Sequence, residues 1–574
     1  MIYSHPLFVS LRVVIVMLLM FNYLSLYGYT VSQKLWLLAG LLLALASIIS
    51  FAFDKKRWSL ALLTAGGFCL FVFAAISTPF LYCWDERFHA LVAKNCMDHP
   101  FSPTLYSEWP IDNVYPEGSW SETSWHHGYV WLHKQPLFLW QIALCFKLFG
   151  VSLFTLRLPS VIMATLMIPL SYRIGSLLVD RRLGFFAALS AAFSWMMLDL
   201  VSGHGAVDHN NVCFFFYITA SLWAWCEYEH SGRKWRWVFI LAVLAGCAVL
   251  TKWLVGLLVY AVWGCYTVCE NRFRLGKVEW LHLLAAMAVT VAVFLPWQIY
   301  TAHAFPETTA QELQLNAEHF YHAVEGHGEG ATFYLRTIPF LYIGDAGYGD
   351  FVSQETAGWS GLRVFHLLLV FVGLGLLVYR LKKWSWRITL MALVLGVYLF
   401  FSLAATKMPA YPFCICVVGF LSLGMLLWEL WRIGDNYVQR AWLRRTVLVG
   451  ATAIFALYQM NMTWFRNYHT AKEGYWIVLT HNREQLDKLK GRLPARTILF
   501  NVRGSDDWAH YDTPIEAMFY IDALCYPFPP SESDFRKLKA AGYYIAILTS
   551  HEVPAYMQSD PEVQKVDLEL WGDY

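Results

Sequence analysis

Residues 77–95 read STPFLYCWDERFHALVAKN, and an apolar run stops there at two adjacent carboxylates, Asp85 and Glu86. The residues after them have helical spacing, with Phe88 and Leu91 on an apolar side, and predict an amphipathic helix along a membrane surface. Carboxylates at the start of a helix face its positive end. The simple explanation is that both acids solvate the end of a span. The alternative is that they serve chemistry at the boundary between lipid and water.

The composition is that of a membrane protein. Of 574 residues, 58% are hydrophobic and 15% are charged, whereas about a quarter of the residues of a soluble domain are charged. The formal net charge of +2 provides no basic field for nucleic acid, and the 27 tryptophans suit membrane interfaces. We therefore expect lipid partners and no nucleic acid.

Apolar runs of about 20 residues, each long enough for one crossing, predict about thirteen transmembrane helices. They lie near 8–28, 35–53, 58–82, 156–178, 185–201, 207–228, 237–251, 254–269, 279–299, 361–380, 387–404, 410–429 and 445–462. We expect an all-α polytopic membrane protein, with residues 1–57 forming two N-terminal helices and residues 58–462 the main membrane domain.

Lys and Arg gather in short loops that fall on one side of this bundle. The loops are 54–57, 180–182, 232–236, 271–277, 381–387 and 440–445. The positive-inside rule makes this side cytoplasmic, together with the N-terminus. The acidic pair, the long outer segments 83–155 and 300–360, and the tail are then extracytoplasmic.

The tail, residues 463–574, has the pattern of a small soluble α/β domain. TILFN at 497–501 and YYIAILTS at 543–550 predict strands. Between them, Ser531 and Asp534 form a capping box at the start of a helix, which we expect to stop at Gly542.

Three lysines on the outer side are candidates for binding a phosphate. Lys134, in WLHKQPLFLWQ at 131–141, precedes an interfacial helix, where a lysine often only extends its head group to water. Lys252 and Lys407 each follow a threonine near the outer end of an apolar run. Compact ammonium charges in a poorly solvated place suit a phosphate group.

The turn GHGAVDHNN at 203–211 places Asp208 among His204, His209 and two asparagines. Such residues are either solvated turn formers or, with the histidines, ligands of a divalent metal ion. Both alternatives stay open.

The segment AEHFYHAVEGHGEGATFYLR at 317–336 is rich in His and Gly and is too long for a simple connection. It predicts a mobile lid over a site. The alternative is a disordered loop.

Taken in order, several motifs resemble those of the dolichyl-phosphate-mannose protein mannosyltransferase superfamily, and most of all its bacterial branch that includes the aminoarabinose lipid A transferase. The acidic pair comes first, and the resemblance covers about residues 58–430. The later motifs are K-x-P-L-x-x-W at 134–140, RLPS at 157–160, LTK at 250–252, PW at 296–297, EHF at 318–320 and SxxxTKxPxY at 402–411.

The resemblance implies a GT-C glycosyltransferase of the bacterial inner membrane. Such an enzyme moves a sugar from a polyprenyl phosphate, for example undecaprenyl phosphate, to a lipid, glycan or protein acceptor at the outer face. By the family pattern, Asp85 is the central acid, Glu86 its companion and Asp208 the second acidic position. Lys134 matches the lysine near the carrier phosphate, and His319 lies in the loop that folds over the site.

Other residues of these motifs are expected to bind substrate or to belong to the lid. His133 stands where the lipid A branch carries an acid, and His89 belongs to the pair that replaces its Arg-Tyr. Tyr411 ends the last motif. We expect these three residues and His319 to lie near the substrate.

The resulting hypothesis assigns one role to the lysines and another to the acidic residues. Lys134 and one or both of the other two lysines neutralise the donor phosphate, Asp85 accepts a proton from an acceptor hydroxyl, and the other two acids orient the substrates. Direct attack on the donor predicts inversion at the anomeric carbon. The rival class is a transporter or flippase of a lipid-linked sugar, and a non-catalytic assembly protein is a third.

Overall fold

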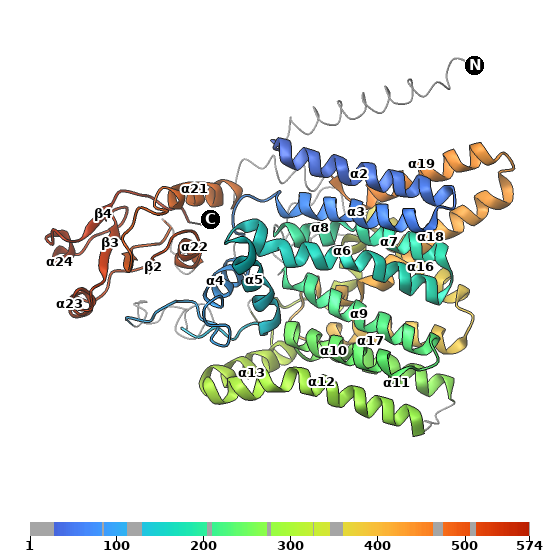
Figure 1. Cartoon of the computed structure of the whole chain (residues 1–574), viewed down its shortest axis with the longest axis horizontal. Helices are drawn as coiled ribbons and strands as arrows, with labels where there is room; N and C mark the ends of the chain where they lie inside the picture. Colours follow the sequence, from blue (N-terminus) through green and yellow to red (C-terminus); the bar gives the residue numbers. More distant parts are fainter. Residues whose placement is uncertain are drawn as a thin grey trace, which may run out of the picture.

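The computed structural model describes residues 28–82, 85–111, 129–203, 209–271, 277–324, 327–344, 360–462, 475–504 and 512–572. Most of the described chain is a bundle of long helices, and the C-terminal residues form a smaller α/β domain at one end of the bundle (Figure 1). Two shorter helices, α4 (Asp85–Asn95) and α5 (Pro136–Phe149), lie between these two parts. The acidic pair is therefore at their junction.

Within the described residues, nine helical segments have the length and hydropathy to cross a membrane. The bundle helices are α2 (Val31–Ala52), α3 (Lys56–Ala75), α6 (Leu153–Leu178), α7 (Arg181–Ala192), α8 (Trp195–Ser202), α9 (Asn210–His230), α10 (Trp235–Lys252), α11 (Leu258–Glu270), α12 (Lys277–Ala304), α16 (Gly361–Arg380), α17 (Trp384–Leu403), α18 (Cys416–Tyr437) and α19 (Ala441–Gln459). Each predicted span after residue 28 coincides with one of these helices or with a consecutive pair. The span predicted at 8–28 falls almost wholly outside the description, so the number of spans stays a prediction.

The apolar segment Trp235–Glu270 is 36 residues long and doubles back on itself. The chain turns through a 3-10 helix, η2 (Trp253–Leu257), between α10 and α11. Arg233, just before α10, and Asn271, just after α11, both hydrogen-bond the carboxylate of Glu279. Both ends of the segment therefore lie together, as the prediction of two spans requires.

The span predicted at 58–82 is too long. α3 ends at Ala75, and residues 76–82 continue without helical structure. Three backbone carbonyls at and after the end of α3 accept hydrogen bonds from Arg157 of α6. Carbonyls inside a helix bond along its axis to the fourth residue onward, so these groups are available to Arg157 only because the helix has ended. The buried arginine thus explains why an apolar sequence is not helical here.

α7 and α8 occupy the centre of the bundle. They correspond to the span predicted at 185–201, and its whole apolar window is buried. The span breaks between the two helices, where the Ser194 side chain caps α8 by accepting a hydrogen bond from the Met197 N–H at 3.4 Å. α8 ends at Gly203, which has a left-handed backbone with φ of 66° and lies beside the site.

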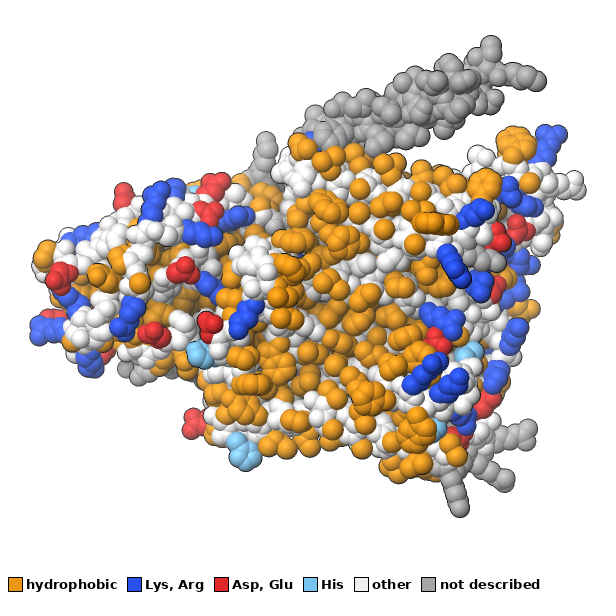
Figure 2. Space-filling model, in the orientation of Figure 1, with side chains coloured by type: hydrophobic (Ala, Val, Ile, Leu, Met, Phe, Trp, Pro, Cys, Tyr) orange, Lys and Arg blue, Asp and Glu red, His pale blue; other side chains and the backbone are white. Residues whose placement is uncertain are grey.

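The basic loops, as far as the structure describes them, lie at the end of the bundle away from the C-terminal domain. Figure 2 shows Lys and Arg side chains gathered at that end, with a broad hydrophobic surface between them and the mixed charges of the C-terminal domain. Arg182 and Arg444, from distant loops, share Asp435 in ion pairs of 2.8 and 3.4 Å. The one-sided distribution of basic residues predicted from the sequence is present in the structure.

The outer segment 300–360 contains helices that the sequence analysis did not predict. α12 continues to Ala304, α13 (Pro306–Tyr321) follows almost at once, and α14 (Phe333–Ile343) comes next. Pro306 occupies the first position of α13, where its missing N–H costs no helical hydrogen bond. The His- and Gly-rich stretch is therefore helical at both ends.

The C-terminal domain has a four-stranded parallel sheet in the order β2-β1-β3-β4. Its elements are α21 (Tyr475–Asp487), β1 (Thr497–Phe500), α22 (Asp512–Tyr520), β2 (Leu524–Cys525), α23 (Glu532–Ala540), β3 (Tyr544–Leu548), α24 (Ala555–Gln558) and β4 (Gln564–Val566). The two predicted strands are the central pair, β1 and β3, with Ile498 opposite Ile545. Ser531 caps α23 by accepting a hydrogen bond from the Asp534 N–H at 3.1 Å. The predicted α/β character of the tail is confirmed, whereas the short outer strands were not predicted.

Candidate functional site

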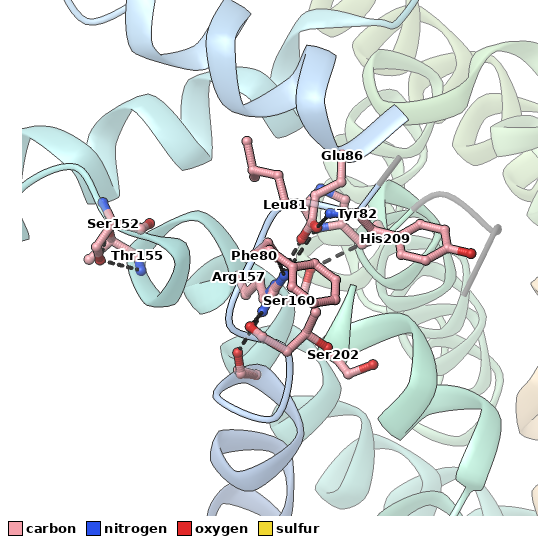
Figure 3. Close-up of polar contacts among 12 residues, drawn as sticks. Phe80, Leu81, Tyr82, Glu86, Ser152, Thr155, Arg157, Ser160, Ser202 and His209 are labelled. Atoms are coloured by element: carbon pink, nitrogen blue, oxygen red, sulfur yellow. Dashed lines mark hydrogen bonds and ion pairs between the residues drawn. The ribbon is translucent and has the colours of Figure 1, made fainter. Parts of the chain in front are cut away.

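Arg157 of α6 holds the chain segment that precedes the acidic pair. Its side chain is fully buried and donates to Glu86 Oε1 at 2.8 Å and Oε2 at 3.0 Å. It also donates to the carbonyls of Ala75 and Thr78 at 3.0 and 2.7 Å. A further hydrogen bond goes to the Phe80 carbonyl at 2.9 Å, and Figure 3 shows Arg157 between Phe80 and Glu86. A guanidinium has five N–H groups, and these contacts use all of them. The carboxylate neutralises the buried cation, and the carbonyls fix the segment that leads into α4.

Glu86 is enclosed on its other sides as well. Its Oε2 accepts a hydrogen bond from the Tyr82 N–H at 2.7 Å. Gly203 lies against Glu86, where a Cβ would be 2.2 Å from Oε1. Only a glycine fits there, both because of this contact and because of its left-handed backbone. Glu86 therefore acts on the shape of the site through Arg157.

Asp85 points to a different side of α4 and pairs with Lys134. The Lys134 Nζ lies 3.3 Å from Asp85 Oδ1 and 3.4 Å from Oδ2. Successive side chains on a helix are about 100° apart, so the buried position of Glu86 turns Asp85 toward the outer surface. The Asp85 side chain is 24% exposed and that of Lys134 is 17% exposed. This pair is accessible to a ligand, whereas the neighbouring pair of Glu86 and Arg157 is not.

The segment that carries Lys134 is fastened on both sides. His133 Nδ1 lies 3.3 Å from the carboxylate of Glu312 in α13. Gln135 accepts a hydrogen bond from the side-chain amide of Gln298 in α12 at 2.8 Å. The two neighbours of Lys134 therefore fasten it to α13 and to the bundle helix α12. His133, expected to be near substrate, lies beside Lys134 and links it to α13.

His89 belongs to α4, and its side chain is fully buried. Its ring centroid is 5.2 Å from that of His209, 5.6 Å from that of Phe138 and 5.9 Å from that of Trp131. These aromatic side chains come from α5 and from the segments that precede α5 and α9. His89 therefore lies inside the wall of the site, and it does not reach the surface on which Asp85 lies.

Lys252 and Tyr411 form a second group at the same end of the bundle. Lys252 Nζ donates to Asn211 Oδ1 at 2.6 Å and lies 5.6 Å from the centroid of the Tyr411 ring. Asn211 is in the first turn of α9, and Tyr411 opens the 3-10 helix η3 (Tyr411–Ile415). Two motifs separated by about 160 residues are thus adjacent in the fold.

Lys407 is connected to the region predicted as a lid. Its side chain is buried, and Nζ donates to the Ala404 carbonyl at 2.7 Å. Its backbone N–H donates to the His327 carbonyl at 2.9 Å, and the Thr406 N–H donates to the His319 carbonyl at 3.0 Å. The segment after α13 therefore pairs with the Thr-Lys motif. His319 contributes its backbone to this contact, and the mobility of the lid stays a prediction.

The same helix that begins with the acidic pair also holds the C-terminal domain. Arg87 pairs with Glu516 of α22 at 3.1 Å, and both side chains are almost completely buried, with 1% and 0% exposed. The Leu81 N–H donates to the Tyr520 hydroxyl at 2.9 Å, and burial raises the pKa of Tyr520, so its hydroxyl stays neutral. The first three residues of α4 therefore pair with the Lys134 segment, with α6 and with the C-terminal domain.

Asp208 and His204 lie outside the described residues. Among the residues that the structure describes, no group of three or more His, Cys, Asp and Glu side chains could hold a metal ion. The alternatives for the 203–211 turn, solvated turn formers or ligands of a metal ion, stay predictions, and so does the acidic site position that the resemblance implies for Asp208.

Sequence reasoning missed two buried arginines. Arg157 belongs to the RLPS motif but received no role, although a cation inside an apolar span requires a partner. That rule would have pointed to Glu86, which is the counterion. Arg87 and Glu516 are 429 positions apart in the chain, and no local pattern connects them.

The architecture is the GT-C fold of polytopic membrane proteins. The crystal structure of ArnT from Cupriavidus metallidurans bound to undecaprenyl phosphate matches with a TM-score of 0.56 and 14% identity, over 84% of this chain and 88% of that chain. The structure of the same protein in the apo state matches with a TM-score of 0.53 and 15% identity, over 85% and 88%. At these identities the shared property is the fold. The predicted fold class is confirmed, and the chain is an integral membrane protein.

Sequence similarity points to a particular family and relative. The family described as dolichyl-phosphate-mannose-protein mannosyltransferase matches residues 133–300. The undecaprenyl phosphate-alpha-4-amino-4-deoxy-L-arabinose arabinosyl transferase of Pseudomonas paraeruginosa (strain DSM 24068 / PA7) is 26% identical over 255 residues, which are 43% of this chain and 40% of that protein. The match therefore spans less than half of that relative's length. The resemblance inferred from the motifs is confirmed.

Proposed function

We propose that the protein is an integral-membrane glycosyltransferase that moves a sugar from a polyprenyl phosphate to a lipid, glycan or protein acceptor. The observation that carries this proposal is the partly exposed pair of Asp85 and Lys134. An acid and a cation lie there within reach of a ligand, at one end of a bundle that has the fold of ArnT. The relative named above uses an undecaprenyl-phosphate-linked sugar by its name, and we propose the same donor class here.

The site can serve the two charges that develop when a glycosyl phosphate is cleaved. Positive charge grows on the sugar ring, and negative charge grows on the departing phosphate. Lys134 binds the phosphate as a point charge, and one or both of Lys252, from the second group, and Lys407, beside the lid segment, supply further positive charge. The bond from the anomeric carbon to the phosphate oxygen breaks, and polyprenyl phosphate leaves.

Asp85 acts on the acceptor. A partly exposed ion pair is worth about 0–1 kcal/mol, so a donor phosphate can replace the Asp85 carboxylate at Lys134 at small cost. The carboxylate then accepts the proton of an acceptor hydroxyl while the acceptor oxygen bonds to the anomeric carbon. This direct attack inverts the anomeric configuration. With a phosphate acceptor, which is already anionic, Asp85 positions the substrate instead.

The two other acids orient the site. Glu86 does so through Arg157, whose contacts fix the chain that leads to Asp85. We assign Asp208 the same class of role from its place in the motif order, and a divalent metal ion held near it is the alternative. A chelator titration of the transfer reaction separates these two roles.

The membrane orientation follows from the distribution of charge. Because Lys and Arg gather at one end of the bundle (Figure 2), we assign that end to the cytoplasm of a bacterium. The site and the tail domain, residues 463–574, then face the extracytoplasmic side of the inner membrane. The donor head group and the acceptor meet there.

The test is sugar transfer by the purified protein from a panel of polyprenyl-phosphate sugars to a membrane extract. Asp85→Asn should reduce the rate by about two to four decades, because general base catalysis contributes that much. The matched control is Asp98→Asn, which removes an exposed carboxylate just after the same helix and should leave the rate unchanged. A loss below threefold in Asp85→Asn would remove Asp85 from this role. Donor flipping in liposomes without transfer would favour the transporter class.

A further inference from the structure

A cavity of about 510 Å³ opens at the basic end of the bundle, opposite the site described above. It lies where the turn between α2 and α3, the starts of α7 and α19, and the end of α18 meet. Four arginines and three aspartates are among its lining residues. The arginines are Arg181, Arg182, Arg444 and Arg445. The transfer chemistry uses none of these residues.

The four arginines of the cavity outnumber its three aspartates, Asp54, Asp180 and Asp435. Asp180 accepts hydrogen bonds from two N–H groups of α7 at 2.9 Å and from the Trp428 indole at 3.0 Å. Asp435 is shared by Arg182 at 2.8 Å and Arg444 at 3.4 Å. In the part of the chain that the structure describes, Arg181 and Arg445 form no ion pair with a carboxylate. Arg445 instead lies 4.6 Å over the ring of Phe53.

Helix ends add to the positive potential of the cavity. The N-terminus of a helix carries a partial positive charge, which favours an anion and disfavours a cation. α3, α7 and α19 all begin here, and basic residues occupy their starts. Neither Lys55 before α3 nor Arg440 before α19 caps its helix with a side-chain hydrogen bond. An anion in the cavity would relieve this concentration of positive charge.

The surroundings indicate that the anion comes from lipid. Trp58 and Trp442 near the starts of α3 and α19 are 68% and 66% exposed, as is typical of side chains at a membrane interface. Beyond them α19 exposes Val447 and Ile454, an apolar surface along which acyl chains can lie. Basic pockets between transmembrane helices on the cytoplasmic side suit anionic lipid head groups.

We propose that this cavity binds the phosphate head group of an anionic phospholipid of the leaflet at the basic end. Arg181 and Arg445 are its principal contacts, and the acyl chains follow α19. The lipid joins the first described helices to the last ones of the bundle. This site is separate from the donor site and does not depend on the proposed reaction.

The experiment is native mass spectrometry of the full chain in detergent, titrated with phosphatidylglycerol, with phosphatidylcholine or with inorganic phosphate. Each basic side chain near an anionic head group contributes roughly a factor of five in affinity. The double variant R181Q/R445Q should therefore bind phosphatidylglycerol about 25-fold more weakly. The matched control is K234Q/R236Q, which removes two exposed cations at the same membrane side, one of them over the Trp237 ring. It should bind like the wild type.

Two further measurements keep the outcome clear. R181K/R445K preserves the charge and should retain most of the affinity, and the unfolding temperature without lipid should be the same in all variants. Phosphatidylglycerol should raise that temperature in the wild type and not in R181Q/R445Q. Equal binding of phosphatidylcholine, an equal loss in both double variants, or binding of inorganic phosphate without lipid binding would overturn the proposal.

Discussion

Replacing Glu86 by glutamine would test whether the two adjacent acids do different work. The substitution keeps the shape of the side chain but leaves the Arg157 guanidinium buried without a carboxylate. Glu86 and Arg157 side chains are 4% and 0% exposed. Asp85→Asn is the natural comparison, since it makes the same chemical change one residue earlier in a partly exposed pair.

The expected magnitudes differ for these neighbours. Removing one partner of a buried ion pair costs about 3–5 kcal/mol. We expect about 3 kcal/mol for Glu86→Gln, because the amide oxygen still accepts one hydrogen bond and three carbonyls still hold Arg157. Asp85→Asn should cost about 1 kcal/mol or less, as exposed pairs do.

The assay is thermal unfolding in detergent followed by tryptophan fluorescence, together with the transfer rate at a temperature where every variant is folded. Glu86→Gln should lower the unfolding temperature clearly and reduce the rate partly. Asp85→Asn should leave the unfolding temperature almost unchanged and reduce the transfer rate by about two to four decades. The double variant Glu86→Gln with Arg157→Gln should lose less unfolding free energy than the two single variants lose together, because it contains no unpaired buried charge.

Equal unfolding temperatures for Glu86→Gln and Asp85→Asn would refute the division between a structural and a reactive acid. So would additive effects in the double variant, because the two side chains would then not depend on each other.

Three other predictions concern the surroundings of the site. Gly203→Ala places a Cβ 2.2 Å from Glu86 Oε1 at a φ of 66° and should destabilise the protein by about 1–3 kcal/mol, whereas Gly450→Ala, which meets no atom within 4 Å, should not lower the unfolding temperature. Glu516→Gln leaves Arg87 without its carboxylate and should speed protease release of the C-terminal domain, and Glu562→Gln at an exposed position should not; equal cleavage rates would contradict the docking role. Burial lowers the pKa of His551 below its ordinary 6.5, so the unfolded chain binds more protons below that pH and the C-terminal domain should lose stability as the pH falls from 7 to 5. His551→Gln should flatten this dependence in circular dichroism melts, and an unchanged slope would contradict it.

The sequence predicted the helix positions well because the bilayer sets both the length and the hydropathy of a span. It failed at residues 76–82, where Ile76, Phe80 and Leu81 extend the apolar run past Pro79 but the backbone serves Arg157. Apolarity alone cannot tell a helix from an extended chain wrapped around a buried cation. The partner of that cation is 71 positions away, beyond any local pattern.

The sequence predicted which residues belong to the candidate site better than it predicted their contacts. Asp85 and Lys134 were both named, and the structure shows that they pair. His89 was expected near substrate, but its fully buried ring packs in a cluster of aromatic side chains beside His209. The docking of the C-terminal domain on α4 depends on surfaces from opposite ends of the chain, so no reading of either segment could reveal it.

The three charges that open α4 have a consequence for how this chain tolerates change. Substituting one of them breaks one contact and leaves the other two in register. Inserting or deleting a single residue at the start of α4 would rotate all later side chains by about 100°, and every one of the three contacts would be lost at once. In relatives that keep this arrangement, insertions and deletions should therefore fall in other loops. The three consecutive residues Asp85, Glu86 and Arg87 should stay uninterrupted.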